Sequence, residues 1–187
     1  MQHTHLSLPI IVGTQRKDNI SSQVGTYIHT KIQQQADTTS ELFLASDILL
    51  PQDDYGQAIK DSVPIYTKAI TESDGIIIVT PEYNHGYPGT LKSILDLLLD
   101  EYTHKVAGIV EVSSGKFGGV RVIEQLLPVL RELGLVTIHT DLYIPHAQDY
   151  FGEHATKDTK IFDESIEKFL NELFWMGSVL RWGREQL

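Results

Sequence analysis

The ten residues from Pro81 to Thr90 carry the most distinctive chemistry of this 187-residue chain. Two prolines and two glycines among them fix an unusual backbone path. Tyr83 and Tyr87 offer flat ring faces, and Asn84 offers an amide that can make two hydrogen bonds at once. These residue types predict a loop that binds a planar heteroaromatic ligand, although an ordinary strand-to-helix turn can have a similar composition.

A second loop, from Gly13 to Ser21, has the groups that solvate a phosphate dianion. Thr14 and Ser21 supply hydroxyls, Arg16 supplies a guanidinium, and the helix that follows would add free N–H groups. This interpretation as a phosphate cup competes with a simpler one, in which a hydroxyl side chain before a helix only caps that helix.

A third loop, Ser113 to Gly119, contains three glycines, which let backbone N–H groups approach a ligand edge closely. A plain flexible turn would have the same composition. The pair Gly115-Lys116 is found in P-loops, but Phe117 stands where Ser or Thr must bind magnesium, so we reject a P-loop. The dinucleotide fingerprint G-x-G-x-x-G is also missing after the first strand.

Hydrophobic patterns predict the elements that would position these loops. Short apolar runs indicate five strands, and apolar residues at helical spacing indicate five helices, in strict alternation. We expect strands at residues 8–12, 42–45, 75–80, 106–112 and from 135 onward. We expect helices from about residue 20 to 32, 63 to 72, 90 to 101, 120 to 133 and 159 to 181. Pro128 should kink or break the fourth helix, and Gly134 should end it.

Such alternation predicts a three-layer α/β sandwich, with a parallel sheet covered by helices on both faces. We expect the flavodoxin-like strand order 2-1-3-4-5, in which the carboxyl ends of strands 1, 3 and 4 are neighbours. The three loops follow these three strands. A phosphate cup beside two loops rich in Gly, Tyr and Ser would suit a phosphorylated planar ring, and FMN has this shape.

At this point the chain resembles the NADPH-dependent FMN reductase family of flavodoxin-like proteins, which includes quinone, azo-dye and chromate reductases. The similarity covers about residues 8 to 145, through the three loops and Leu91-Lys92. The resemblance implies that Thr14, Arg16 and Ser21 bind the FMN phosphate. It implies further that the ribityl chain and isoalloxazine ring are lined by Pro81, Glu82, Tyr83 and Asn84, and the far ring edge by Ser113, Ser114 and Gly115.

Lys116 and Phe117 are departures from the family pattern, because many relatives carry another small or polar residue at these positions. They put the size of the pocket and the choice of substrate in doubt. His85 lies inside the middle loop and could touch flavin or substrate, although a solvent-facing histidine is the simpler interpretation. The other histidines show no ligand spacing with carboxylates, so we expect no metal site.

Composition excludes several classes of protein. The chain has 25 acidic and 15 basic residues, and its formal charge of −10 disfavours nucleic acid as a partner. It lacks cysteine, a secretory signal and an apolar run long enough to span a membrane. We therefore expect a cytoplasmic protein with one domain over residues 1–187 and no membrane partner.

The last helix suggests self-association. Trp175, Met176, Leu180 and Trp182 are spread too widely around it to face one core. The family resemblance agrees, since its members generally form dimers or pairs of dimers. We therefore expect a homodimer or homotetramer.

The predicted function is an FMN-dependent NAD(P)H oxidoreductase. FMN would pass a hydride from NADPH or NADH to a small acceptor, such as a quinone, free flavin, azo compound or metal oxyanion, and no side chain need act as acid, base or nucleophile. No arginine that reads a 2′-phosphate is identifiable, so no preference between NADH and NADPH follows. Two alternatives stay open: an electron carrier that docks a protein through an acidic face, and a flavin-binding sensor.

Overall fold

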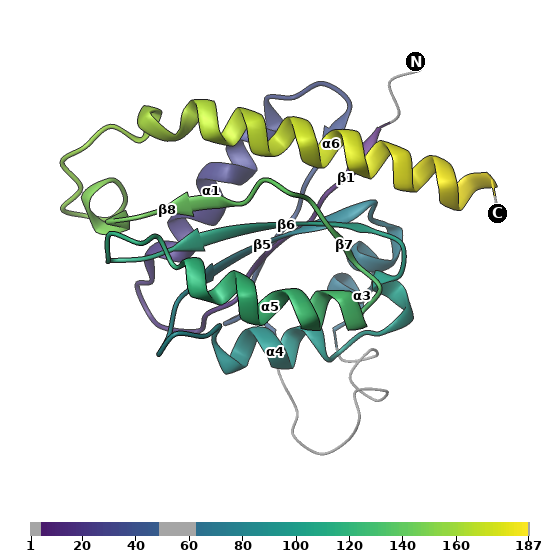
Figure 1. Ribbon diagram of the computed structural model, residues 1–187, viewed down its shortest axis with the longest axis horizontal. Helices are drawn as coiled ribbons and strands as arrows, with labels where there is room; N and C mark the ends of the chain where they lie inside the picture. The colour runs from purple at the N-terminus through teal and green to yellow at the C-terminus, as the bar shows by residue number, and fades with distance from the viewer. Residues whose placement is uncertain (1–4, 49–62, 187) are drawn as a thin grey trace.

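The computed structural model describes residues 5–48 and 63–186, and it is built around a six-stranded parallel sheet (Figure 1). The strand order is β4-β2-β5-β6-β7, and β8 also pairs with β6. These strands are β2 (Ile10–Val12), β4 (Leu42–Leu44), β5 (Gly75–Pro81), β6 (Val106–Val112), β7 (Val136–Thr137) and β8 (Leu142–Ile144). A second, two-stranded sheet pairs β1 (Leu6–Ser7) with β3 (Thr38–Thr39). The loop expected around Pro51 to Gly56 lies outside the described residues.

The prediction of an α/β fold with a parallel sheet is confirmed, but the prediction of five strands is wrong. The last strand is interrupted between β7 and β8. There the amides of His139 and Thr140 donate to the carboxylate of Glu172, at 2.9 and 3.1 Å, and no longer pair with β6. The first strand, expected at residues 8–12, is shortened to β2, and β1 precedes it; between them the Ser40 hydroxyl donates to the Leu8 carbonyl at 2.8 Å.

Two layers of helices cover the sheet (Figure 1). One core cluster lies between the sheet and α1 (Ile20–Gln33) and α6 (Asp163–Gln186). The other lies between the sheet and α3 (Pro64–Glu72), α4 (Gly89–Leu95) and α5 (Val120–Glu132). Short 3₁₀ segments are η1 (Asp100–Tyr102), η2 (Ala147–Asp149) and η3 (Thr159–Phe162). Among the described helices, none combines the length and apolar character that a bilayer crossing requires.

Two helices differ from their predicted form. The helix expected from residue 90 to 101 ends at Leu95, and the chain turns before η1. Helix α5 continues through Pro128, so it is not broken there. Leu126 and Leu130, on either side of Pro128, are fully buried and hold both halves against the core. Gly134 ends this helix as predicted, with φ +74° and an N–H that donates to the Arg131 carbonyl at 3.0 Å.

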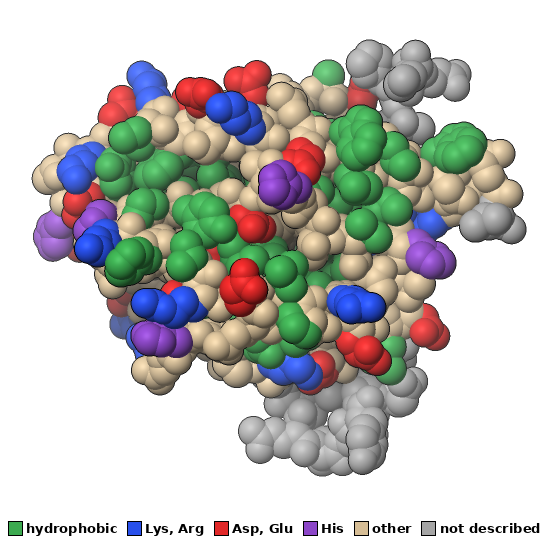
Figure 2. All heavy atoms as spheres, in the orientation of Figure 1, with side chains coloured by type: hydrophobic (Ala, Val, Ile, Leu, Met, Phe, Trp, Pro, Cys, Tyr) green, Lys and Arg blue, Asp and Glu red, His purple; other side chains and the backbone are tan. Residues whose placement is uncertain are grey.

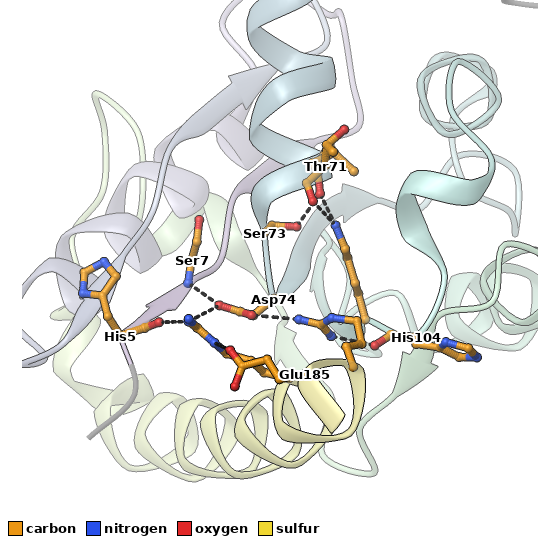
Figure 3. Close-up of polar contacts among 11 residues, drawn as sticks. His5, Ser7, Thr71, Ser73, Asp74, His104 and Glu185 are labelled. Atoms are coloured by element: carbon orange, nitrogen blue, oxygen red, sulfur yellow. Dashed lines mark hydrogen bonds and ion pairs between the residues drawn. The ribbon is translucent and has the colours of Figure 1, made fainter. Parts of the chain in front are cut away.

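The carboxylate of Asp74 anchors the C-terminal end of α6 to the amino ends of the strands (Figure 3). Asp74 accepts hydrogen bonds from the Ser7 amide at 3.0 Å and from Arg184 at 2.8 Å, and Arg181 lies at 3.4 Å. Arg181 also donates to the His5 carbonyl. This charged network therefore holds the C-terminal end of α6 near the amino ends of the strands, at the end of the sheet opposite the three loops.

Candidate functional site

The three predicted loops leave the sheet at one edge. Strands β2, β5 and β6 are adjacent and parallel, with Val12 beside Val79 and Pro81 beside Val112. The loops that follow them therefore begin side by side, at the place where open α/β sheets bind ligands.

Direct contacts join the first loop to the middle loop. The hydroxyls of Thr14 and Tyr83 lie 2.7 Å apart, and the guanidinium of Arg16 lies 3.8 Å from the centre of the Tyr83 ring. Thr90, at the start of α4, donates to the Gly13 carbonyl at 2.8 Å. The structure thus brings Thr14, Arg16 and Tyr83 together at one point, with Thr14 buried and Arg16 exposed.

The start of α1 has the features of an anion site. Its N-cap is Asn19, whose side chain accepts from the Ser22 amide at 2.8 Å. Ser21 is therefore not the cap; it lies largely buried in the first turn of α1. A hydroxyl in the first turn, beside the amides of a helix N-terminus, fits a phosphate group.

The middle loop is a tight and well-supported turn. Tyr83 and Gly86 exchange backbone hydrogen bonds of 2.8 and 3.0 Å. The two residues between them, Asn84 and His85, have φ values of +52° and +68° and are exposed. Gln125 of α5 donates to the His85 carbonyl at 2.9 Å. The exposed amide of Asn84 is therefore presented by a fixed backbone.

An ion pair that the sequence analysis missed also supports the middle loop. Arg121, in the first turn of α5, lies 3.1 Å from Glu82, whose side chain is only 14% exposed. Arg121 and Gln125 are 39 and 40 residues from their partners. Nothing in the local pattern of α5 indicates these contacts, because both residues occupy ordinary exposed helical positions.

The third loop is supported from the side of β8. Ser113 donates its amide to the Ile144 carbonyl at 3.1 Å, and its hydroxyl accepts from the Gly115 amide at 3.0 Å. Gly115 in turn accepts from the His146 amide, and Ser114 and Gly115 are exposed. No hydrogen bond between residues 113–115 and the first two loops is found in the described ranges. Strand pairing places residues 113–115 beside them, and Arg121, which is paired with Glu82, lies 5.7 Å from the centre of the Phe117 ring in the same loop.

Two carboxyl groups near the third loop have pKa values well above the ordinary range. Burial, reinforced by the charges of Glu82 and Asp141, raises the pKa of Glu111 to about 9. Burial also raises the pKa of Asp141 to about 6. The sequence analysis did not single out Glu111, although a lone carboxyl residue inside the apolar strand at residues 106–112 was a visible signal.

The sheet is parallel, and the loops that follow β2, β5 and β6 carry residues suited to ligand binding. This is the architecture of a flavodoxin-like protein. The sequence model of "NADPH-dependent FMN reductase" matches residues 7–149. The chain therefore belongs to this family, and the predicted resemblance is confirmed.

Similar proteins agree with this assignment. The chain is 26% identical to a 2-hydroxy-1,4-benzoquinone reductase from Burkholderia sp, over 83% of this chain and 88% of the relative. It is 30% identical to a quinone reductase from Escherichia coli strain K12, over 67% and 69% of the two chains. The protein is thus an oxidoreductase of the NAD(P)H-dependent FMN and quinone reductase type, and the family match favours an enzyme over a carrier or a sensor.

Solved structures support the fold. The flavoenzyme NAD(P)H:(acceptor) oxidoreductase FerB from Paracoccus denitrificans superimposes with a TM-score of 0.74 at 23% identity, over 92% of this chain and 98% of FerB. The flavodoxin-like architecture is therefore confirmed, and the family makes FMN the cofactor and NAD(P)H the electron donor.

Proposed function

We propose that the three loops bind FMN and that the protein uses NADPH or NADH to reduce a small acceptor at this site. The observation that carries the proposal is the junction of Thr14, Arg16 and Tyr83 beside the open first turn of α1. When bound, FMN would supply hydride transfer from NAD(P)H to the acceptor.

In this proposal the first loop holds the FMN phosphate. Arg16 supplies a positive charge, Thr14 and Ser21 supply hydroxyls, and the open amides of Ile20 and Ser21 supply N–H donors. These local groups are needed because the protein as a whole, with a formal charge of −10, repels anions.

The other two loops would hold the ring. Tyr83 and Asn84 are supported by the hydrogen-bonded turn to Gly86, and Glu82 is fixed by its ion pair with Arg121. Such rigid support would orient the ring for both substrates. In this arrangement the ribityl chain and ring are lined by Pro81, Glu82, Tyr83 and Asn84, and the far edge by Ser113, Ser114 and Gly115.

For the acceptor we propose a quinone. Two of the relatives compared above are quinone reductases by name. Our proposal assigns no acid, base or nucleophile to the side chains of this chain, which would instead bind, orient and exclude water. We also propose that the chain is one domain, acts in the cytoplasm and forms a homodimer or homotetramer.

The phosphate assignment can be tested by comparing FMN with riboflavin, which lacks the phosphate. Replacing Arg16 by Ala should weaken FMN binding about tenfold to hundredfold, the equivalent of ~1.5 to 3 kcal/mol for a charge-assisted contact, and leave riboflavin binding nearly unchanged. Lys17→Ala is the matched control, since it removes a neighbouring exposed cation. Equal affinity of the wild-type protein for riboflavin and FMN would contradict the assignment of this loop to the FMN phosphate.

A further inference from the structure

A buried carboxyl group lies beneath the third loop, and the proposed reaction does not use it. Glu111, near the end of β6, is fully buried. Neither oxygen of its carboxyl group has a hydrogen-bond partner among the described residues. Buried polar groups in folded proteins are nearly always hydrogen-bonded, so this one requires an explanation.

The carboxyl group lies directly against the turn that begins α5. A side-chain carbon added to Gly119 would come within 2.2 Å of Oε2 of Glu111. Gly118 and Gly119 have φ values of +65° and +88°, and they end the loop from Ser113 to Gly119. Gly119 therefore packs directly against the buried carboxyl group.

Acidic groups face Glu111 from the neighbouring elements. Glu82 follows β5, Asp141 precedes β8, and Tyr143 of β8 lies beside Glu111 in the sheet. Arg121 of α5 is engaged with Glu82. An ionised Glu111 would therefore be buried among like charges, and within residues 5–48 and 63–186 no cation is paired to it.

Helix α5 contributes a further acidic group. Burial raises the pKa of Asp141 and of Tyr143, and the charge of Glu124 adds to the rise in both. Burial, together with the charges of Glu82 and Asp141, raises the pKa of Glu111 to about 9 and so keeps it uncharged at neutral pH.

We propose that Glu111 is a positioning residue for the flavin site, holding the turn at Gly118 and Gly119 and through it the loop that begins at Ser113. The inference rests on the proposed function for its link to FMN. Glutamine has the same shape and would support the turn at every pH. Glutamic acid supports it only while it is uncharged, because an ionised carboxylate must take up water and displace the glycines above it.

The first test is FMN affinity as a function of pH, measured by quenching of flavin fluorescence at pH 7.5 and at pH 10. Wild type, Glu111→Gln and the control Glu132→Gln, at an exposed residue in the last turn of α5, should bind FMN alike at pH 7.5. At pH 10 the wild type and the control should lose about tenfold in affinity, whereas Glu111→Gln should not. Ionisation of the flavin itself affects all three proteins alike.

The second test needs no FMN. Amide hydrogen exchange of the segment 113–121 is compared between wild type and Glu111→Gln at each pH, so that the intrinsic exchange rate cancels. The segment should exchange faster in the wild type at pH 10 and equally in both at pH 7.5. If Glu111→Gln does not fold, Glu111→Met replaces it as the variant that cannot ionise.

The outcomes separate the two proposals. Parallel pH dependence of wild type and Glu111→Gln in either measurement overturns the positioning role. If no protein binds FMN at any pH, the proposed function fails, and hydrogen exchange alone decides whether Glu111 holds the turn.

Discussion

Asn84 combines a backbone role with a proposed ligand role, and the two can be separated. Its φ of +52° suits Asn and Gly but strains Ala. Asn84→Gly should leave the melting temperature of the apo protein nearly unchanged and weaken FMN about three- to tenfold, as expected for one lost hydrogen bond. Asn84→Ala should also lower the apo melting temperature, because left-handed backbone costs Ala about 1 kcal/mol.

Thermal unfolding with and without FMN distinguishes these cases, since a ligand raises the melting temperature only of a protein that binds it. If Asn84→Gly keeps the full FMN-induced rise, the amide is not part of the site.

Glu111 should make stability depend on pH. Its pKa is about 9 in the folded protein against an ordinary value of 4.5 for glutamate, so the folded state binds one more proton between these pH values. The free energy of unfolding must therefore fall as pH rises through this window. Glu111→Gln lacks this slope and should be more stable by roughly 1 to 3 kcal/mol at pH 8, with a smaller gain at pH 5.

Urea unfolding at pH 5, 6.5 and 8 measures the difference between wild type and Glu111→Gln. A gain that stays constant across this range would mean that Glu111 ionises normally in the folded protein.

At the scale of elements, the sequence predicted what depends on local pattern and missed what depends on distant partners. The apolar strands β5 and β6 and the periodic helix α1 were predictable because each pattern reflects burial on a sheet or on one helix face. The break between β7 and β8 was not, because it depends on Glu172, about thirty residues away. The same holds in the site, where Thr14, Arg16 and Tyr83 were predictable but their mutual contacts were not.

The start of α5 gives an element-scale prediction. Gly119 has φ +88° and no room for a side chain above Glu111. Gly119→Ala should lower the free energy of unfolding by about 2 to 4 kcal/mol, through backbone strain and overpacking. Gly89→Ala at the start of α4 is the control, because no atom lies within 4 Å of the added carbon. Chemical denaturation should show a large loss for Gly119→Ala only; equal losses would contradict this account of the turn.

At the scale of the whole molecule, α6 carries an exposed apolar stripe. Trp175, Val179 and Trp182 are 63%, 44% and 66% exposed and follow one another at helical spacing. Figure 2 shows hydrophobic side chains over the C-terminal half of this helix. Met176 and Leu180, by contrast, pack against the core. An exposed stripe of this kind favours association with a second copy.

Sedimentation at micromolar concentration tests the proposed assembly. Trp175→Glu combined with Trp182→Glu should convert a dimer or tetramer to a smaller species, because charges would be buried in the interface. Ile161→Glu is the control at an equally exposed apolar residue outside α6. A wild-type protein that is strictly monomeric, yet binds flavin and is fully active, would contradict the dimer.

The most direct measurement is the absorbance spectrum of the purified protein with FMN under nitrogen, before and after NADPH is added. We expect flavin bands on the protein that bleach with NADPH or NADH and return when a quinone is added. A protein that retains no FMN, or whose flavin bands persist with both nicotinamides, would contradict the proposal that these three loops form a reductase site.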